Sequence, residues 1–110
     1  MKIEKYSNKM QKFLKQEYGE KEKINNALNI FIQEGKDIAQ TMGIEDLTDD
    51  NVLLELYAEY RIYSAMGNEK IASFKLSSFN NLIKGILELE KRRSSEKKQA
   101  KKKGMLIFNE

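Results

Sequence analysis

Apolar residues recur every three or four positions along most of the chain, and this spacing predicts amphipathic helices. The first set is Ile3, Tyr6, Met10 and Phe13, with lysines on the other faces. It predicts a helix over residues 2–18, ended by Gly19, because glycine adopts the left-handed conformation that closes a helix. This helix packs either on its own domain or on a neighbouring subunit, and the spacing does not choose between the two.

A second helix is expected over residues 21–42, ended by Gly43. Its apolar positions repeat at alternating spacings of four and three, and they are Ile24, Leu28, Phe31, Gly35, Ile38 and Met42. A glycine inside a helix costs about 1 kcal/mol relative to alanine. Gly35 is therefore interpreted either as a place where another helix approaches closely or as a tolerated weak spot.

A third helix is expected over residues 49–66, with Thr48 as its N-cap and Asp49 and Asp50 at its positive end. Its broad apolar and aromatic face should form the centre of the core. The face consists of Val52, Leu53, Leu56, Tyr57, Tyr60, Tyr63 and Met66. The three tyrosines could stack nucleic-acid bases, but helical tyrosines more commonly pack in a core with their hydroxyls reaching water or a partner.

The fourth helix is expected over residues 69–93, with Asn68 as its cap. Its apolar residues are Ile71, Phe74, Phe79, Leu82, Ile83, Ile86 and Leu89. Beyond Glu90 the apolar pattern stops, and the helix either continues as a Lys-rich rod or frays. The predicted fold is therefore an all-α bundle of about four helices, with a helical domain at 1–93 and a basic C-terminal extension at 94–110.

The end of the chain combines a basic run with a short apolar run. The basic residues are Lys91, Arg92, Arg93, Lys97, Lys98, Lys101, Lys102 and Lys103, and the apolar tetrad is Met105, Leu106, Ile107 and Phe108. A charge run is usually solvated, although it can also grip phosphate. The tetrad has the composition of a segment that binds a partner protein or packs back onto the helices. We interpret the two parts as a basic spacer and an apolar anchor.

Composition supports long helices and opposes most enzymatic chemistry. The chain has no proline and six glycines, and 34% of its residues are charged. Residues 91–103 have a net charge of +7, so the remaining residues carry −4 for the whole chain to have +3. Any contact with nucleic acid is therefore expected through the extension, and the acidic body is a poor candidate.

Candidate catalytic and cofactor sites are hard to find in this sequence. Histidine and cysteine are absent, which removes the commonest general base and the thiolate metal ligands. Asp46, Asp49 and Asp50 lack the pattern of a calcium loop and are better explained as capping residues. The glycines are scattered and form no phosphate loop. We expect no enzyme, cofactor or metal site, and an intracellular, soluble protein with no membrane span.

The segment from Ile24 to Arg93 resembles the small helical head-to-tail connector proteins of tailed phages. The resemblance lies in the helix ending Ile38-Ala39-Gln40-Thr41-Met42-Gly43, the acids at Asp49 and Asp50, the Tyr57-Ala58-Glu59-Tyr60 segment and the final long helix. It implies a subunit of a ring, expected to be a dodecamer, that sits beneath the portal protein in the virion neck and extends the DNA channel. It also implies that the C-terminal extension docks on the portal or on an adjacent subunit, and that the protein is made in the host cytoplasm. The extra N-terminal helix and the long basic segment depart from the pattern of that family.

The alternative hypothesis is a small nucleic-acid-binding protein, for DNA packaging or regulation. It would contact phosphates through the basic residues, with an affinity that falls steeply with salt.

Overall fold

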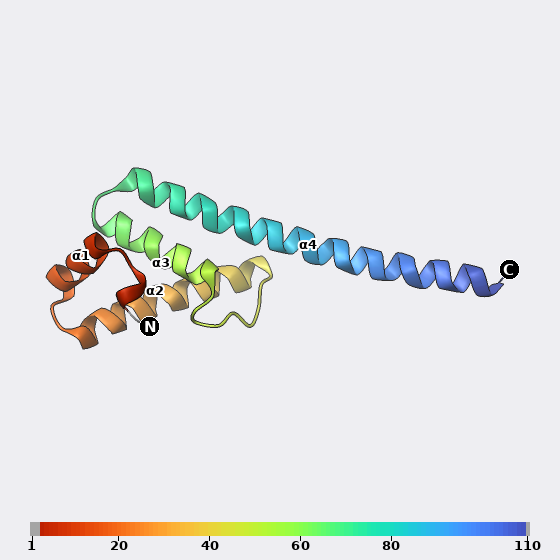
Figure 1. Cartoon of the computed structure of the whole chain (residues 1–110), viewed down its shortest axis with the longest axis horizontal. Coiled ribbons are helices and arrows are strands. Elements are labelled where there is room, and N and C mark those ends of the chain that lie inside the picture. Colours follow the sequence, from red (N-terminus) through yellow and green to blue (C-terminus); the bar gives the residue numbers. More distant parts are fainter. Residues whose placement is uncertain (1–2, 110) are drawn as a thin grey trace.

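The computed structural model describes the backbone of residues 3–109 and the side chains of residues 3–93. Within that part of the chain the fold is all-α, as predicted, with four α-helices and no strand (Figure 1). A short 3-10 turn, Ile3–Lys5, precedes the helices, which are α1 (Asn8–Tyr18), α2 (Lys21–Met42), α3 (Val52–Ala65) and α4 (Glu69–Asn109).

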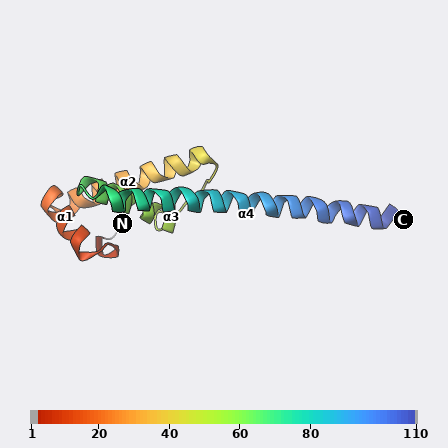
Figure 2. The same cartoon turned by 90° about the horizontal axis from the view of Figure 1, so that it is seen from above.

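Helix α3 is the centre of the bundle, because it packs against each of the other three helices. Helix α4 runs antiparallel to α3 and then continues well beyond the remaining helices, which form a compact head at one end of the molecule (Figures 1 and 2). The molecule is accordingly elongated, with dimensions of 72 × 28 × 22 Å. The first part of α4 is therefore supported by the head on one side only.

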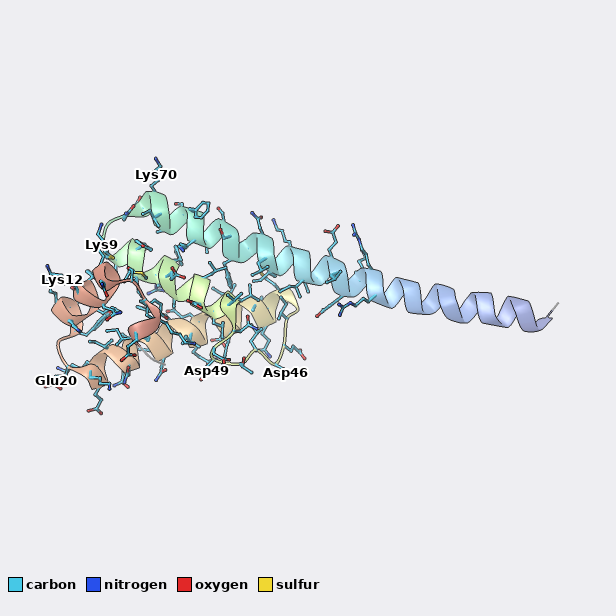
Figure 3. The ribbon with its side chains drawn as sticks, viewed as in Figure 1. Lys9, Lys12, Glu20, Asp46, Asp49 and Lys70 are labelled. Carbon is cyan, nitrogen blue, oxygen red and sulfur yellow. The ribbon has the colours of Figure 1, made fainter. Side chains whose placement is uncertain are left out.

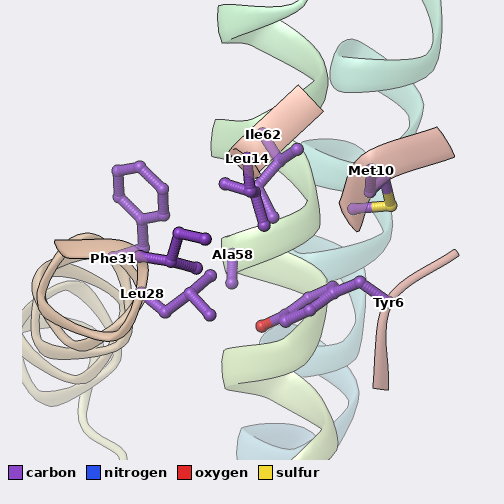
Figure 4. Packing of buried hydrophobic residues seen from close by; sticks show 8 residues of the cluster. Tyr6, Met10, Leu14, Leu28, Phe31, Ala58 and Ile62 are labelled. Carbon is purple, nitrogen blue, oxygen red and sulfur yellow. The ribbon is translucent and has the colours of Figure 1, made fainter. Parts of the chain in front are cut away.

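One core cluster joins α1, α2 and α3 (Figure 4). Its buried members are Tyr6, Met10, Leu14, Ile24, Leu28, Phe31, Ala58 and Ile62. The helix over the first residues of the chain thus packs on its own domain, which decides between the two alternatives for these residues. A second cluster joins the end of α2, the connection after it, α3 and α4. Its buried members are Ala39, Ile44, Leu53, Tyr57, Phe79 and Ile83.

Two helices begin later than the sequence indicated. Helix α1 starts at Asn8, because the hydroxyl of Ser7 accepts a hydrogen bond from the Met10 amide (3.3 Å). The prediction that Thr48 caps the third helix is wrong. The cap is Asn51, whose side chain accepts from the amide of Leu53 at 2.9 Å, and its own amide donates to the Thr48 carbonyl in a preceding turn. Asparagine is as good a cap as threonine, so composition alone did not separate the two.

The expected glycine stops and the Asn68 cap are confirmed. Gly19, Gly43 and Gly67 all have positive φ and follow the ends of helices α1, α2 and α3. Asn68 accepts a hydrogen bond from the Ile71 amide at the start of α4. Helix α4 does not end near residue 93 but continues through Ser94 and Ser95 to Asn109. Of the two alternatives for the residues beyond Glu90, the backbone shows the continued helix.

Gly35 marks a close approach between α2 and α3. A Cβ atom at this position would lie 3.1 Å from Cδ2 of Leu54 and 3.2 Å from Cβ of Tyr57. These distances are shorter than ordinary van der Waals contact. Of the two interpretations of Gly35, the structure supports the close approach.

The burial of Tyr6 leads to a prediction about alkaline pH. Burial, with a smaller contribution from Glu55 and Glu59, raises the pKa of the Tyr6 hydroxyl, whereas an unfolded chain has a tyrosine pKa of about 10. Above that pH the unfolded state loses the proton while the folded state keeps it. Stability should therefore fall by up to about 1.4 kcal/mol per pH unit as pH rises from about 10. Urea unfolding at pH 9 to 11 checks this. The Tyr6→Phe variant should show a shallower fall, and an identical fall would contradict the assignment to Tyr6.

Candidate interaction surface on α4

Helix α4 carries two sets of apolar residues on different sides. The set that faces the head includes Ala72, Phe79 and Ile83, which are all buried. Leu76, Ile86 and Leu87 are half-buried beside them. This set anchors α4 on α3 and on the end of α2, and it explains why the helix packs against the head at all.

The second set is exposed, and the head does not cover it. Ile71 is 37% exposed, Phe74 68%, Leu82 37% and Leu89 50%. Ser78 and Gly85 lie between them at the same helical spacing. We call these six residues, Ile71, Phe74, Ser78, Leu82, Gly85 and Leu89, the α4 stripe.

The α4 stripe follows the geometry of a straight helix. Its members are separated by 3, 4, 4, 3 and 4 residues, which is 18 residues or about five turns of 3.6 residues, a length of about 27 Å. At about 100° per residue the centre of the stripe lies roughly 130° around the helix from the centre of the buried set. A single apolar face cannot include both, so α4 has one face for the head and one that is free in the isolated chain.

The stripe is also continuous in its chemistry. Gly85 has nothing within 4 Å of the place where a Cβ would sit, and the Ser78 hydroxyl is turned back onto its own helix, donating to the Phe74 carbonyl at 2.9 Å. Neither residue therefore places a charge or an unsatisfied donor in the stripe. Exposed apolar surface of this extent and regularity is typical of a protein–protein contact.

Sequence patterning did not separate the two sets on α4. Phe74, Leu82 and Leu89 were expected in the core face and are exposed, as are Ile38 and Val52 in other helices. Conversely, Leu54, Ala58 and Ile62 are buried in α3 although the expected face did not include them. The buried set and the exposed set of α4 both repeat with helical period. Only the position of α3 against α4 shows which set is covered.

The basic run, residues 91–103, begins on the free part of α4. Lys91, Arg92 and Arg93 are exposed, and none of the ion pairs found among residues 3–93 involves them. The remaining basic residues, Lys97, Lys98, Lys101, Lys102 and Lys103, lie outside the residues whose side chains are described. The same holds for the proposed anchor Met105, Leu106, Ile107 and Phe108, whose backbone belongs to α4. The contacts predicted for both groups stay predictions.

The acidic connection between α2 and α3 forms no metal site in the described residues. Figure 3 shows Asp46 and Asp49 on this connection. Asp49 forms an ion pair with Lys36 of α2, and a hydrogen bond from Thr48 lowers the pKa of the Asp50 carboxyl. Over residues 3–93 no three metal-binding side chains come together. Asp49 and Asp50 thus have partners beside the turn before α3, and none of the three acids caps this helix as predicted, because its N-cap is Asn51.

The tyrosines of α3 pack within the molecule. The ring centroids of Tyr57 and Tyr60 are 5.5 Å apart, and those of Tyr57 and Phe79 are 5.3 Å apart, in tilted arrangements. Such contacts contribute to the core. Tyr57 is buried, and Tyr60 and Tyr63 are half-buried. The Tyr57 ring is therefore used by the core, in agreement with the commoner of the two interpretations.

Glu34 links α2 to α3 through two residues. The Tyr57 hydroxyl donates to its carboxylate at 3.1 Å, and Nη1 of Arg61 does so at 2.6 Å. The Arg61 guanidinium also lies over the Phe31 ring, 5.1 Å from its centroid. Burial raises the pKa of the Tyr57 hydroxyl, and Arg61 partly offsets this. Burial alone would lower the pKa of Arg61, but the hydrogen bond to Tyr57 and the charge of Glu34 raise it.

We expect the Glu34→Gln substitution to cost about 1 kcal/mol or less in the free energy of unfolding. Glu34 and Arg61 are about a third exposed, so water and salt screen their interaction. Guanidinium and urea unfolding would measure the loss, with Glu45→Gln in the exposed connection as the control. An equal loss of stability for the two variants would mean that Glu34 does not help to hold α2 against α3.

In residues 3–93, no helix has an apolar stretch long and pure enough to cross a bilayer. Comparisons of the chain with protein-family models, with curated proteins and with solved structures found no match.

Proposed function

We propose that this chain is a structural assembly protein without catalytic activity, and that another subunit covers the α4 stripe. The stripe is the single observation that carries the proposal. Four large apolar side chains are exposed along one side of a helix whose other side already packs on the head. An apolar face of this kind is stable in water when a protein partner covers it.

The specific form that we propose is a head-to-tail connector of a tailed phage. The sequence resemblance supports it, and so does a compact helical head with a long projecting helix. In this role the chain would form a ring, expected to be a dodecamer, beneath the portal protein in the virion neck, with DNA passing through the channel without sequence-specific contacts. Met105, Leu106, Ile107 and Phe108 would then anchor the chain on the portal or on a neighbouring subunit.

Assembly with a portal protein tests this role directly. The full chain would be mixed with the portal protein encoded in the same genome, and the complex would be measured by light scattering and imaged by electron microscopy. We expect a ring on the portal, and loss of binding when residues 104–110 are deleted. Detection of the chain in purified virions by mass spectrometry is the matching test of location. A chain that is missing from virions and indifferent to the portal would rule out the connector role.

Contact with nucleic acid is the second candidate function, favoured by Lys91, Arg92 and Arg93 at the start of the +7 segment, which are exposed and form no ion pair with another residue of 3–93. Binding to duplex DNA should weaken with salt, and the log–log slope should fall by about 0.9 for each phosphate contact removed. Replacing Lys101, Lys102 and Lys103 together with Gln should reduce this slope, and it should weaken binding to the same extent for every DNA sequence. Fluorescence anisotropy would measure the affinity for DNA at salt concentrations from about 50 to about 300 mM, which is the range in which such slopes are determined. Absence of binding at the lowest salt would exclude this function.

A further inference from the structure

We propose that the free chain forms a two-fold symmetric dimer in which the α4 stripes of two copies pack antiparallel, centred near residue 80. The proposal does not rest on the connector role. It follows from the order of large and small residues in the stripe and from the charges beside it and beyond it.

The stripe is complementary to its own reverse. When two copies are aligned antiparallel about residue 80, Ile71 faces Leu89 of the second copy, and Leu82 faces Ser78. Phe74 faces Gly85 in the same alignment. The most exposed large residue of the stripe, Phe74, is thereby placed opposite the glycine with open space where a Cβ would be. Large side chains facing small ones allow two helices to interdigitate.

The same alignment places opposite charges together at both ends. Lys70 and Glu88 are exposed and lie on the same side of the stripe, because 18 residues make five whole turns. Figure 3 shows Lys70 at the start of α4, pointing away from the head. In a two-fold antiparallel pair each Lys70 meets Glu88 of the other copy, so the contact is made twice. Such pairs at the edge of a helix interface determine orientation more than affinity.

The basic run, residues 91–103, disfavours the parallel arrangement. Residues 91–103 have a net charge of +7, and a parallel pair would lay two such segments side by side along α4. The antiparallel pair sends them to opposite ends. Their centres are then about 50 Å apart at a rise of 1.5 Å per residue, several times the screening length of about 8 Å at physiological salt. Repulsion between extensions therefore favours the antiparallel dimer.

The dimer should be reversible. Four large apolar residues per copy along one helix make an interface smaller than the ~800 Å² per partner of a standard stable complex. We therefore expect dissociation on dilution in the micromolar range. Because a ring neighbour or another partner would cover the same stripe, the dimer is the form of the free chain, and assembly must open it.

Cysteine cross-linking of the full chain tests the orientation, and the native sequence contains no cysteine to interfere. Lys70→Cys and Glu88→Cys are each prepared alone and then mixed under mild oxidation. The antiparallel pair predicts cross-linking of Lys70→Cys to Glu88→Cys in the mixture and little in either variant alone. Self-cross-linking of Lys70→Cys as efficient as its cross-linking to Glu88→Cys, or no cross-linking in the mixture, would overturn the proposal.

Light scattering at protein concentrations from about 5 to about 500 µM, a range that includes the expected dissociation constant, tests the interface itself. Phe74→Ser and Gly85→Leu should make the chain monomeric while circular dichroism shows an unchanged fold. Lys70→Glu should weaken the dimer by several-fold and the double variant Lys70→Glu, Glu88→Lys should restore it. A chain that is monomeric throughout this range would refute the dimer and leave the connector role untouched. A ring-sized mass for the free chain would refute the dimer and support the connector role.

Discussion

The Phe79→Ala substitution should lower the free energy of unfolding by about 3–5 kcal/mol, the largest loss that we expect from one substitution in this chain. Phe79 is completely buried, and its cluster includes Ala39 from α2, Tyr57 from α3 and Ile83 from its own helix. Removing the ring leaves a cavity where three helices meet. The loss is a large share of the 5–15 kcal/mol that a domain of this size usually has.

Phe74→Ala is the matched control for this experiment. It removes the same ring from the same helix, but Phe74 is 68% exposed and lies on the α4 stripe. Its effect on unfolding should stay below about 1 kcal/mol. Both variants would be unfolded in urea at a protein concentration low enough to keep the chain monomeric. Equal losses for the two would mean that α4 is rotated about its axis relative to the structure described here.

The Gly35→Leu substitution should cost about 3 kcal/mol, because it forces α2 and α3 apart. A Cβ alone would already lie 3.1 Å from Leu54 and 3.2 Å from Tyr57, and leucine adds three further carbon atoms. The same residues that crowd Gly35 are buried in the core, so they have little room to move.

Gly85→Leu is the control, since Gly85 is also inside a helix but has nothing within 4 Å of a Cβ. Leucine has a better helix propensity than glycine, so this variant should gain up to about 0.8 kcal/mol as a monomer. The two variants are expected to change the free energy of unfolding in opposite directions, which separates the effect of helix propensity from the effect of packing. Should Gly35→Leu be as stable as the native chain, the close approach of α2 to α3 would be wrong.

The sequence located the helices because it contains local signals that act within one turn. Gly19, Gly43 and Gly67 end helices where the chain needs a positive φ, and Asn68 caps α4 with its own side chain. The choice between Thr48 and Asn51 as a cap was missed, since both residue types accept the same hydrogen bond and lie three positions apart. The close approach at Gly35 was one of two interpretations that the sequence allowed, and the short distances to Leu54 and Tyr57 in the structure decided between them.

The candidate surface could not be predicted in this way. Phe74 and Phe79 belong to one run of apolar residues, and each fits a repeat of helical period although the two repeats lie on different sides of the helix. The buried Tyr57 and the exposed Val52 of α3 show the same ambiguity on a shorter helix. Apolar periodicity indicates that a side chain is suited to burial. It does not indicate whether the helix that covers the side chain belongs to the same chain or to a partner.

The sequence by itself therefore determined the helical class, most helix ends and the separation of an acidic body from a basic extension, since these depend on local backbone preferences and on charge counting. Only the tertiary structure decided which apolar set of α4 is used by the head and which is left free. The reason is geometric: α3 has one side to offer α4, so it covers Phe79 and Ile83 and leaves the stripe from Ile71 to Leu89 exposed.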